Sequence, residues 1–305
     1  MNGRPSDQKV QRTLRCREQE DTAVAEAAEH RELTFTDTDF EKVRQLIHQR
    51  AGIALAMHKR EMVYSRLARR LRALGHKSFK QYLQALEGQG EKGAEWEHFV
   101  NALTTNLTSF FREAHHFPLL AEHVRNRSEP VRIWCCAAST GEEPWSLAIT
   151  LSEALGSRAS NARIIATDID TRALEVARQG IYPMNQIERL SEQQRKSYFQ
   201  RGTGARSGMA RINAALRAMV EFRPLNLLES GWGLEGQFDA IFCRNIMIYF
   251  DKPTQKKLLE RFVPLLKDDG LLFAGHSENF TYLTDAFRLR GHTVYEQSSR
   301  RRMAS

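Results

Sequence analysis

Two adjacent carboxylates, Glu142 and Glu143, stand at the end of a loop of small residues and are well placed for ligand chemistry. The loop follows an apolar run, Val131–Cys136, and leads into a helical pattern with Pro144 in its first turn. In doubly wound folds the loop after the first strand is the usual nucleotide contact. The dinucleotide fingerprint G-x-G-x-x-G is absent, because Gly141 is the one glycine here.

The charge of this loop favours a cationic ligand. Glu142 and Glu143 would occupy the helix N-terminus where a pyrophosphate otherwise binds, although simple capping of the helix is an open alternative. Asp168 ends the second apolar run, at the position where such folds bind ribose hydroxyls, and a capping role for it also stays open. Asp170 fits the N-cap of the next helix. Together these acids favour a cationic nucleoside, and S-adenosylmethionine is such a ligand.

The elements that must position these residues alternate between strand and helix from Val131 onward. This alternation predicts an α/β fold with a doubly wound, mainly parallel sheet. The last apolar run, Thr293–Tyr295, is expected as an antiparallel edge strand. A turn-rich stretch interrupts the pattern, with Met209–Ile212 and Met219–Phe222 as its strands, and it predicts a small antiparallel β-subdomain inserted over residues 183–223.

The N-terminal part has a different pattern of polar and apolar residues. Residues 1–32 are polar and without periodicity, which predicts a poorly ordered tail. Residues 33–105 carry helical patterns and predict a small all-helical domain, followed by the ligand-binding domain over 106–305. One helix is expected over residues 58–74, ending at Gly75, with four leucine or valine side chains turned inward: Val63, Leu67, Leu71 and Leu74.

The composition excludes several classes of protein. The chain has 45 Lys and Arg against 37 Asp and Glu, a net charge of +8, which points to nucleic acid, an anionic membrane or an acidic protein as partner. No apolar stretch is long enough to cross a bilayer, and four cysteines give no disulfide framework. A reduced, cytoplasmic protein is expected. The His115-His116 pair lacks partners at metal-ligand spacing, so no metal site is predicted.

The sequence resembles the bacterial chemotaxis receptor methyltransferases of the CheR type, which transfer a methyl group from S-adenosylmethionine to glutamate side chains of chemoreceptors. The resemblance spans about Leu33 to Tyr295. It is carried by five runs: NALTTNLTSFFREAHHF at 101–117, AASTGEEP at 137–144, ATDIDT at 166–171, FDAIFCRNIMIYFD at 238–251 and LLFAGHSENF at 271–280. It implies a helical N-terminal domain before a class I methyltransferase domain that carries an inserted β-subdomain.

The resemblance also implies roles for individual residues. It assigns Glu143 to the methionyl ammonium of the cofactor, Asp168 to the ribose hydroxyls, and Arg112 to the reacting centre. The remaining cofactor contacts that it implies are Asn106 and Thr108 at the methionine end, Asn226 and Leu227 at the adenine and sugar, and Arg244 and Asn245 at the mouth of the site, with Tyr249 near the transferred methyl. Alternatives remain: an Arg112–Glu113 ion pair, a core role for Tyr249, and a turn cap at Asn245.

A glutamate acceptor is already anionic at neutral pH, and a sulfonium is already activated, so the chemistry requires no metal or strong base. Arg112 is the candidate for orienting the acceptor carboxylate, and Tyr249 for a hydrogen bond near the methyl.

The partners follow from charge and from the resemblance. Residues 58–80 hold eight basic residues against one acid, which predicts docking of an acidic receptor methylation helix through Arg66, Arg69 and Arg72. In some members of the family the β-subdomain binds a receptor C-terminal peptide as an added strand, and Arg201 and Arg211 stand at the matching positions. The alternative is a nucleic-acid methyltransferase, but the N-P-P-Y-type tetrapeptide is absent. The expected state is a monomer.

Overall fold

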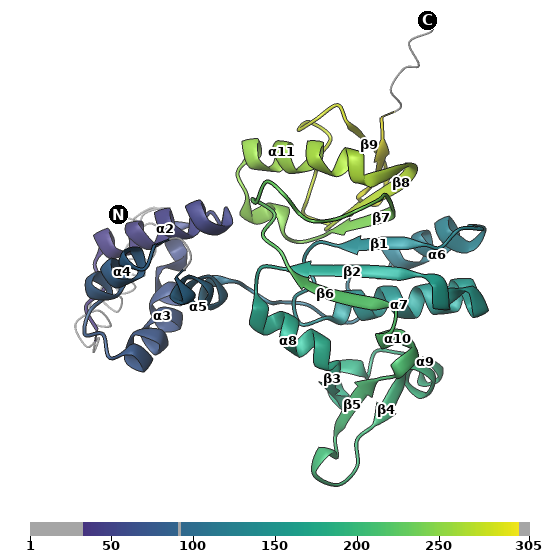
Figure 1. Cartoon of the computed structure of the whole chain (residues 1–305), viewed down its shortest axis with the longest axis horizontal. Coiled ribbons are helices and arrows are strands. Elements are labelled where there is room, and N and C mark those ends of the chain that lie inside the picture. Colours follow the sequence, from purple (N-terminus) through teal and green to yellow (C-terminus); the bar gives the residue numbers. More distant parts are fainter. Residues whose placement is uncertain (1–32, 91–92, 299–305) are drawn as a thin grey trace, which may run out of the picture.

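The structure, a computed structural model, describes residues 33–90 and 93–298; the predicted N-terminal tail lies outside them. Within the described residues, four helices form the first unit, drawn in purple and blue in Figure 1. They are α2 (Asp37–Ala51), α3 (Arg60–Leu74), α4 (Phe79–Gly88) and α5 (Ala94–Leu103). Thr36 begins α2 with a capping box to Asp39, and Gly75 ends α3 in the left-handed conformation. The predicted helical domain is therefore confirmed.

The four helices bury their own apolar core, with the rings of Phe40, Phe79 and Phe99 fully inside it. Two details of the predicted second helix differ. Residues 57–59 form a 3₁₀ turn, so α3 begins at Arg60. Leu74, the last residue of α3, is 43% exposed rather than turned inward.

A seven-stranded sheet forms the second unit, in the order β6-β2-β1-β7-β8-β10-β9. Its strands are β1 (Arg132–Cys135), β2 (Arg163–Asp168), β6 (Val220–Pro224), β7 (Phe238–Cys243), β8 (Leu266–Ala274), β9 (Phe287–Gly291) and β10 (Val294–Gln297). The pairs among β6, β2, β1, β7 and β8 are parallel, and β10 is antiparallel to both of its neighbours. The predicted doubly wound, mainly parallel sheet is confirmed.

The side chains of successive strand residues point to opposite faces of this sheet and pack into two separate cores. Ile133, Cys135 and Phe242 pack on the side of α6 (His116–Arg125) and α7 (Glu142–Leu155). Trp134 and Ile241 pack on the side of α11 (Lys252–Phe262). The sheet is thus covered on both faces, as an α/β sheet with parallel strands requires.

Two strand predictions are wrong in part. The segment near Met219–Phe222 does not belong to the inserted subdomain: β6 pairs in parallel with β2, Ile164 opposite Val220, at the edge of the main sheet. The strand of the run Thr293–Tyr295 is antiparallel as expected but is not at the edge, because β9 lies outside it. The turn at His292–Thr293 is too short for a parallel crossover, so the chain folds β10 back between β8 and β9.

A small three-stranded antiparallel sheet lies below the main sheet in Figure 1. It has the order β3-β5-β4, with β3 (Ile181–Pro183), β4 (Phe199–Arg201) and β5 (Met209–Ile212). Three further helices complete this part of the chain: α8 (Thr171–Gln179), α9 (Glu192–Tyr198) and α10 (Ala214–Arg217). Across residues 33–90 and 93–298, no helix has the length and apolar character needed to span a bilayer.

Candidate functional site

A cavity of about 380 Å³ lies where the carboxyl ends of the central strands meet the helical domain. Its volume is within the range of about 300–1,000 Å³ that small-molecule sites occupy. All ten residues proposed for the cofactor and the reacting centre line it: Asn106, Thr108, Arg112, Glu143, Asp168, Asn226, Leu227, Arg244, Asn245 and Tyr249. Folding therefore brings together residues that are up to 143 positions apart between Asn106 and Tyr249.

The loop between β1 and α7 turns tightly at Gly141, whose φ is +101°. A Cβ there would lie 2.7 Å from Tyr182 Oη and 2.8 Å from Ala177 Cβ, so a side chain does not fit. The turn separates the two acids: Glu143 lines the cavity, whereas Glu142 does not. Thr140 Oγ1 donates to Glu142 at 2.7 Å, and burial raises the pKa of Glu142. Glu143 is thus the acid that faces the cavity.

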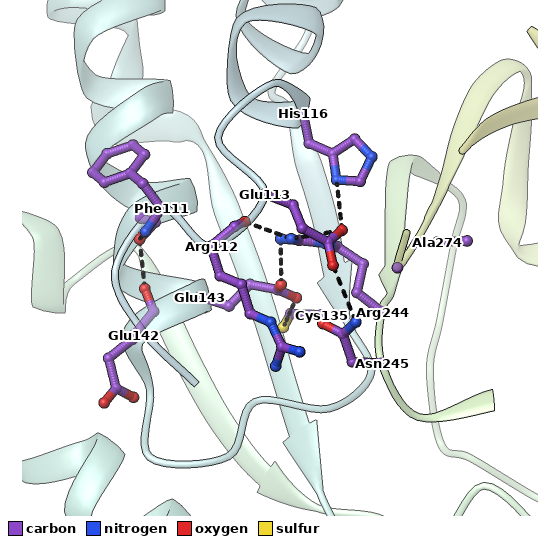
Figure 2. Close-up of polar contacts among 12 residues, drawn as sticks. Phe111, Arg112, Glu113, His116, Cys135, Glu142, Glu143, Arg244, Asn245 and Ala274 are labelled. Carbon is purple, nitrogen blue, oxygen red and sulfur yellow. Dashed lines mark hydrogen bonds and ion pairs between the residues drawn. The ribbon is translucent and has the colours of Figure 1, made fainter. Parts of the chain in front are cut away.

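Arg244 is the centre of a buried polar network at the base of the cavity, drawn in Figure 2. Its Nη1 lies 2.6 Å from Glu143 Oε2, and its Nη2 lies 3.2 Å from Glu113 Oε2. The same Nη2 donates to the Arg112 carbonyl. Cys135 Sγ donates to the other Glu143 oxygen at 3.2 Å. The network fixes the Glu143 carboxylate, and it answers one open alternative, since Glu113 pairs with Arg244 rather than with Arg112.

Two carboxylates hold the turn that follows β7. Asn245 has a φ of +57°, a left-handed conformation that needs support in a non-glycine residue. Glu278 accepts hydrogen bonds from the backbone N–H groups of Asn245 at 2.9 Å, Met247 at 2.7 Å and Gly275 at 2.6 Å. Glu113 Oε1 accepts from Asn245 Nδ2 at 3.1 Å. The turn is therefore anchored at both its backbone and its side chain.

Glu113 is ionised in this setting. Burial opposes its charge, but hydrogen bonds from His276 and Asn245 and the positive charge of Arg244 outweigh burial and lower its pKa to about 2. Its neighbour His116 is fully buried and stays neutral, because burial and the charge of Arg244 lower its pKa to about 4. From the sequence, Glu113 is considered only as an alternative ion-pair partner of Arg112 and Glu278 has no predicted role, although both lie within the runs that carry the family resemblance.

Asp168 lies at the tip of β2 and lines the cavity. Its carboxylate accepts hydrogen bonds from the backbone N–H groups of Ser139 at 2.7 Å and Asp170 at 2.9 Å. Burial nevertheless raises its pKa to about 6, so the carboxylate is only partly compensated by the protein and suits hydroxyl donors of a ligand. Asp170 caps α8, as expected, and also accepts from Asn106 Nδ2 at 2.8 Å.

The helical domain forms part of the cavity wall, which no pattern in the sequence predicts. Ile53, Lys59 and Met62 line it. Two hydrogen bonds hold this wall in place: Asn226 Nδ2 donates to the Arg50 carbonyl at 2.8 Å, and Ala54 N donates to the Tyr249 carbonyl at 2.8 Å. Ile53 and Met62 are also packed against the core of the helical domain, so their apolar character alone does not mark them as cavity residues.

The five predicted docking arginines lie away from the cavity and in different settings. Arg69 and Arg72 are exposed on α3. Arg66 is half-buried and donates to the Thr104 carbonyl at 2.6 Å, so it ties α3 to the segment after α5. Arg201 is exposed on β4, whereas Arg211 on β5 is half-buried. The basic surface of α3 is consequently smaller than the sequence alone predicts.

A parallel sheet with the strand order seen here, an acid at the tip of the second strand and an acidic first loop define a class I S-adenosylmethionine-dependent methyltransferase. Across the described parts of the chain, no group of three or more His, Cys, Asp or Glu side chains is arranged to hold a metal ion.

Comparisons with known proteins give the family. Residues 106–296 match the family model described as "CheR methyltransferase, SAM binding domain", and residues 38–104 match "CheR methyltransferase, all-alpha domain". The chain belongs to the CheR methyltransferase family, and its cofactor is S-adenosylmethionine. It is 59% identical over 266 residues to a chemotaxis protein methyltransferase of Salmonella typhimurium, covering 87% of this chain and 92% of the relative. The corresponding protein of Escherichia coli is 57% identical, covering 87% and 93%.

Proposed function

We propose that this protein transfers the methyl group of S-adenosylmethionine to glutamate side chains of chemoreceptors, giving glutamate methyl esters for chemotactic adaptation. The observation that carries this proposal is one cavity lined by two carboxylates and a guanidinium: Glu143, Asp168 and Arg112. The Salmonella typhimurium and Escherichia coli relatives are named chemotaxis protein methyltransferases, and the chain covers 92% and 93% of their lengths. Their names support the same activity. Methylation of nucleic acid has no comparable support.

The cofactor supplies an activated methyl on a sulfonium, so the residues of the chain bind, orient and exclude water. Glu143, held by Arg244, would accept hydrogen bonds from the methionyl ammonium, and Asp168 from the ribose hydroxyls. Arg112 would orient the acceptor carboxylate, because a guanidinium matches a carboxylate with two parallel hydrogen bonds. Tyr249 lines the same cavity, and its hydroxyl would donate a hydrogen bond near the reacting oxygen. Placement at attack distance is then the main source of rate enhancement.

The experiment that tests the activity is transfer of labelled methyl from S-adenosylmethionine to chemoreceptor-containing membranes, followed by mild alkali. Carboxyl methyl esters are hydrolysed by base, whereas N-methyl groups are not. We expect alkali-labile label on receptors. Alkali-stable label, or label on added RNA in place of the receptors, would contradict the proposal.

Arg112→Lys and Arg112→Ala test the orienting role. We expect turnover to fall by about ten- to a hundredfold in the alanine variant, the loss expected for a hydrogen bond to a charged group. Lysine restores charge without the two-pronged geometry and should recover only part of this loss. Arg112 also donates a hydrogen bond to the Leu107 carbonyl at 2.6 Å, and both substitutions change this bond in the cavity wall. Cofactor affinity is therefore measured in parallel, to separate a change in the wall from a loss of orientation. Wild-type turnover in the alanine variant would remove Arg112 from the mechanism.

The docking roles belong to the same proposal. Arg69 and Arg72, with a smaller part for Arg66, would attract an acidic methylation helix of the receptor. Arg201 and Arg211 on the β-subdomain would hold a receptor C-terminal peptide. The protein would act as a monomer recruited from the cytoplasm to receptor arrays. A pull-down against receptors with and without the terminal peptide, using wild-type protein and the Arg201→Glu variant, tests the peptide contact.

A further inference from the structure

Two large apolar side chains are exposed to solvent at the opening of the cavity. Leu107 is 77% exposed and Ile248 is 52% exposed, and both also line the cavity. A side chain that meets both conditions lies at the rim, so we call Leu107 and Ile248 the rim pair. Other exposed large apolar side chains of the described residues, such as Val176 on α8 and Leu289 on β9, lie away from this cavity.

The backbone holds both members of the rim pair in place. The Leu107 carbonyl accepts a hydrogen bond from Arg112 Nη1 at 2.6 Å. Ile248 lies in the 3₁₀ turn Met247–Tyr249, where Glu278 accepts from Met247 N and the Tyr249 carbonyl accepts from Ala54 N. The two side chains are thus presented to solvent by anchored segments, so little ordering of backbone opposes a partner that covers them.

The same opening carries positive charge. Lys59 and Arg112 line the cavity, and neither forms an ion pair with any residue that the structure describes. The third cation, Arg244, is neutralised by Glu143 and Glu113. A partner that fits this rim therefore brings a carboxylate for the cations and apolar groups for the rim pair.

We propose that the rim pair binds the apolar side chains that flank the acceptor glutamate on the receptor segment being methylated. This inference rests on the proposed function, since it takes the receptor as the partner. The carboxylate enters toward Arg112 while its apolar neighbours cover Leu107 and Ile248 and exclude water from the opening. The rim pair thereby selects glutamates that have nonpolar neighbours, whereas the charges of α3 select any acidic helix.

The test is the double variant Leu107→Ser/Ile248→Ser in the labelled-methyl assay with receptor membranes. We expect KM for receptor to rise roughly tenfold, the loss expected when two partly covered apolar side chains are removed. Turnover at saturating receptor and affinity for S-adenosylmethionine should stay within twofold of wild type. The rise in KM should persist at high salt, because apolar contact is not screened. Leu289→Ser, on the far edge of the sheet, is the matched control and should leave KM unchanged.

Several results would overturn the inference. An unchanged KM in the double variant would show that the rim pair does not meet the receptor. A parallel loss of cofactor affinity would assign these side chains to the cofactor site. A change of oligomeric state in sedimentation, seen in the double variant alone, would assign the surface to a second copy of the chain. A wild-type protein that transfers no methyl to receptors would instead contradict the proposed function itself, which distinguishes the two failures.

Discussion

The proposed ribose contact of Asp168 predicts that cofactor binding depends on pH. Burial raises its pKa to about 6 in the free protein, and hydroxyl donors of the ribose favour the ionised form. Protonation therefore competes with binding, so affinity is nearly full by pH 7 and falls as the pH drops through 6. Affinity for S-adenosylmethionine should be about tenfold weaker at pH 5 than at pH 7, because about a tenth of such carboxyls remain ionised one unit below their pKa.

Calorimetric titration between pH 5 and pH 7 measures this dependence, in a range where the methionyl ammonium stays protonated. Asp168→Asn is the matched variant: it should bind more weakly at pH 7 and lose most of the pH dependence. An unchanged slope in the variant would assign the titration to another group.

Glu113 makes a separate prediction about positioning. Glu113→Gln keeps a partner for Asn245 but removes the charge opposite the buried Arg244. The free energy of unfolding should fall by about 1–3 kcal/mol at pH 7, the penalty for weakening a buried hydrogen bond to a charged group, and cofactor affinity should fall with it. Urea unfolding and cofactor titration measure the two effects.

The pH dependence identifies the cause. The pKa of Glu113 is lowered to about 2, so its stabilisation is complete above the unfolded value of 4.5 and is lost as pH falls from there toward 2. The difference between wild type and variant should be smaller at pH 4 than at pH 7. Glu192→Gln, in an exposed pair with Lys196, is the control and should change stability by less than about 0.5 kcal/mol. Equal differences at both pH values would contradict the electrostatic explanation.

At the scale of elements, helix α3 carries both the proposed docking arginines and a structural one. Arg69→Glu/Arg72→Glu should raise KM for receptor by roughly fivefold to tenfold at low salt, and the effect should shrink as salt screens the exposed charges. Arg66→Glu should instead lower the melting temperature, because Arg66 binds the Thr104 carbonyl. Receptor titrations at several salt concentrations test this, with Lys257→Glu on α11 as control. Docking through α3 would be contradicted if Arg69→Glu/Arg72→Glu and Lys257→Glu raised KM for receptor equally.

Short-range patterns predicted most elements, and long-range pairing explains where they failed. The alternation of strand and helix and the capping residues Thr36 and Gly75 are local signals, so the fold class could be predicted from them. Which strand lies beside β2 or β8 depends on contacts between distant parts of the chain. Local patterns therefore do not predict that β6 pairs with β2, or that β10 lies inside the sheet between β8 and β9. Within the site, Asp168 had a local signal in its place after a strand. Glu278 had none, because it acts on Asn245, 33 positions earlier in the chain.

At the scale of the whole molecule, the cavity couples the two domains. Its walls include Lys59 and Met62 from the helical domain and Asp168 from the sheet domain. A ligand that binds this cavity should therefore stabilise both domains together, by about 2.7 kcal/mol at a hundred times its Kd.

Differential scanning calorimetry with and without S-adenosylhomocysteine checks this expectation. We expect the unfolding of both domains to move to higher temperature and to merge into one transition. A shift confined to one of two separate transitions would show that the ligand contacts a single domain.

The position of β10 between β8 and β9 has a consequence for biosynthesis. A ribosome delivers β8 and β9 first, yet β9 joins the sheet only through β10. The Tyr295 hydroxyl on β10 accepts a hydrogen bond from the backbone N–H of Phe280 at 3.1 Å, two residues after the carboxylate that holds the Asn245 turn. This contact of the loop that carries Glu278 therefore forms only after β10 has emerged from the exit tunnel. A nascent chain stalled before Val294 would hold every proposed cofactor residue and still lack this contact, so we expect it to be inactive.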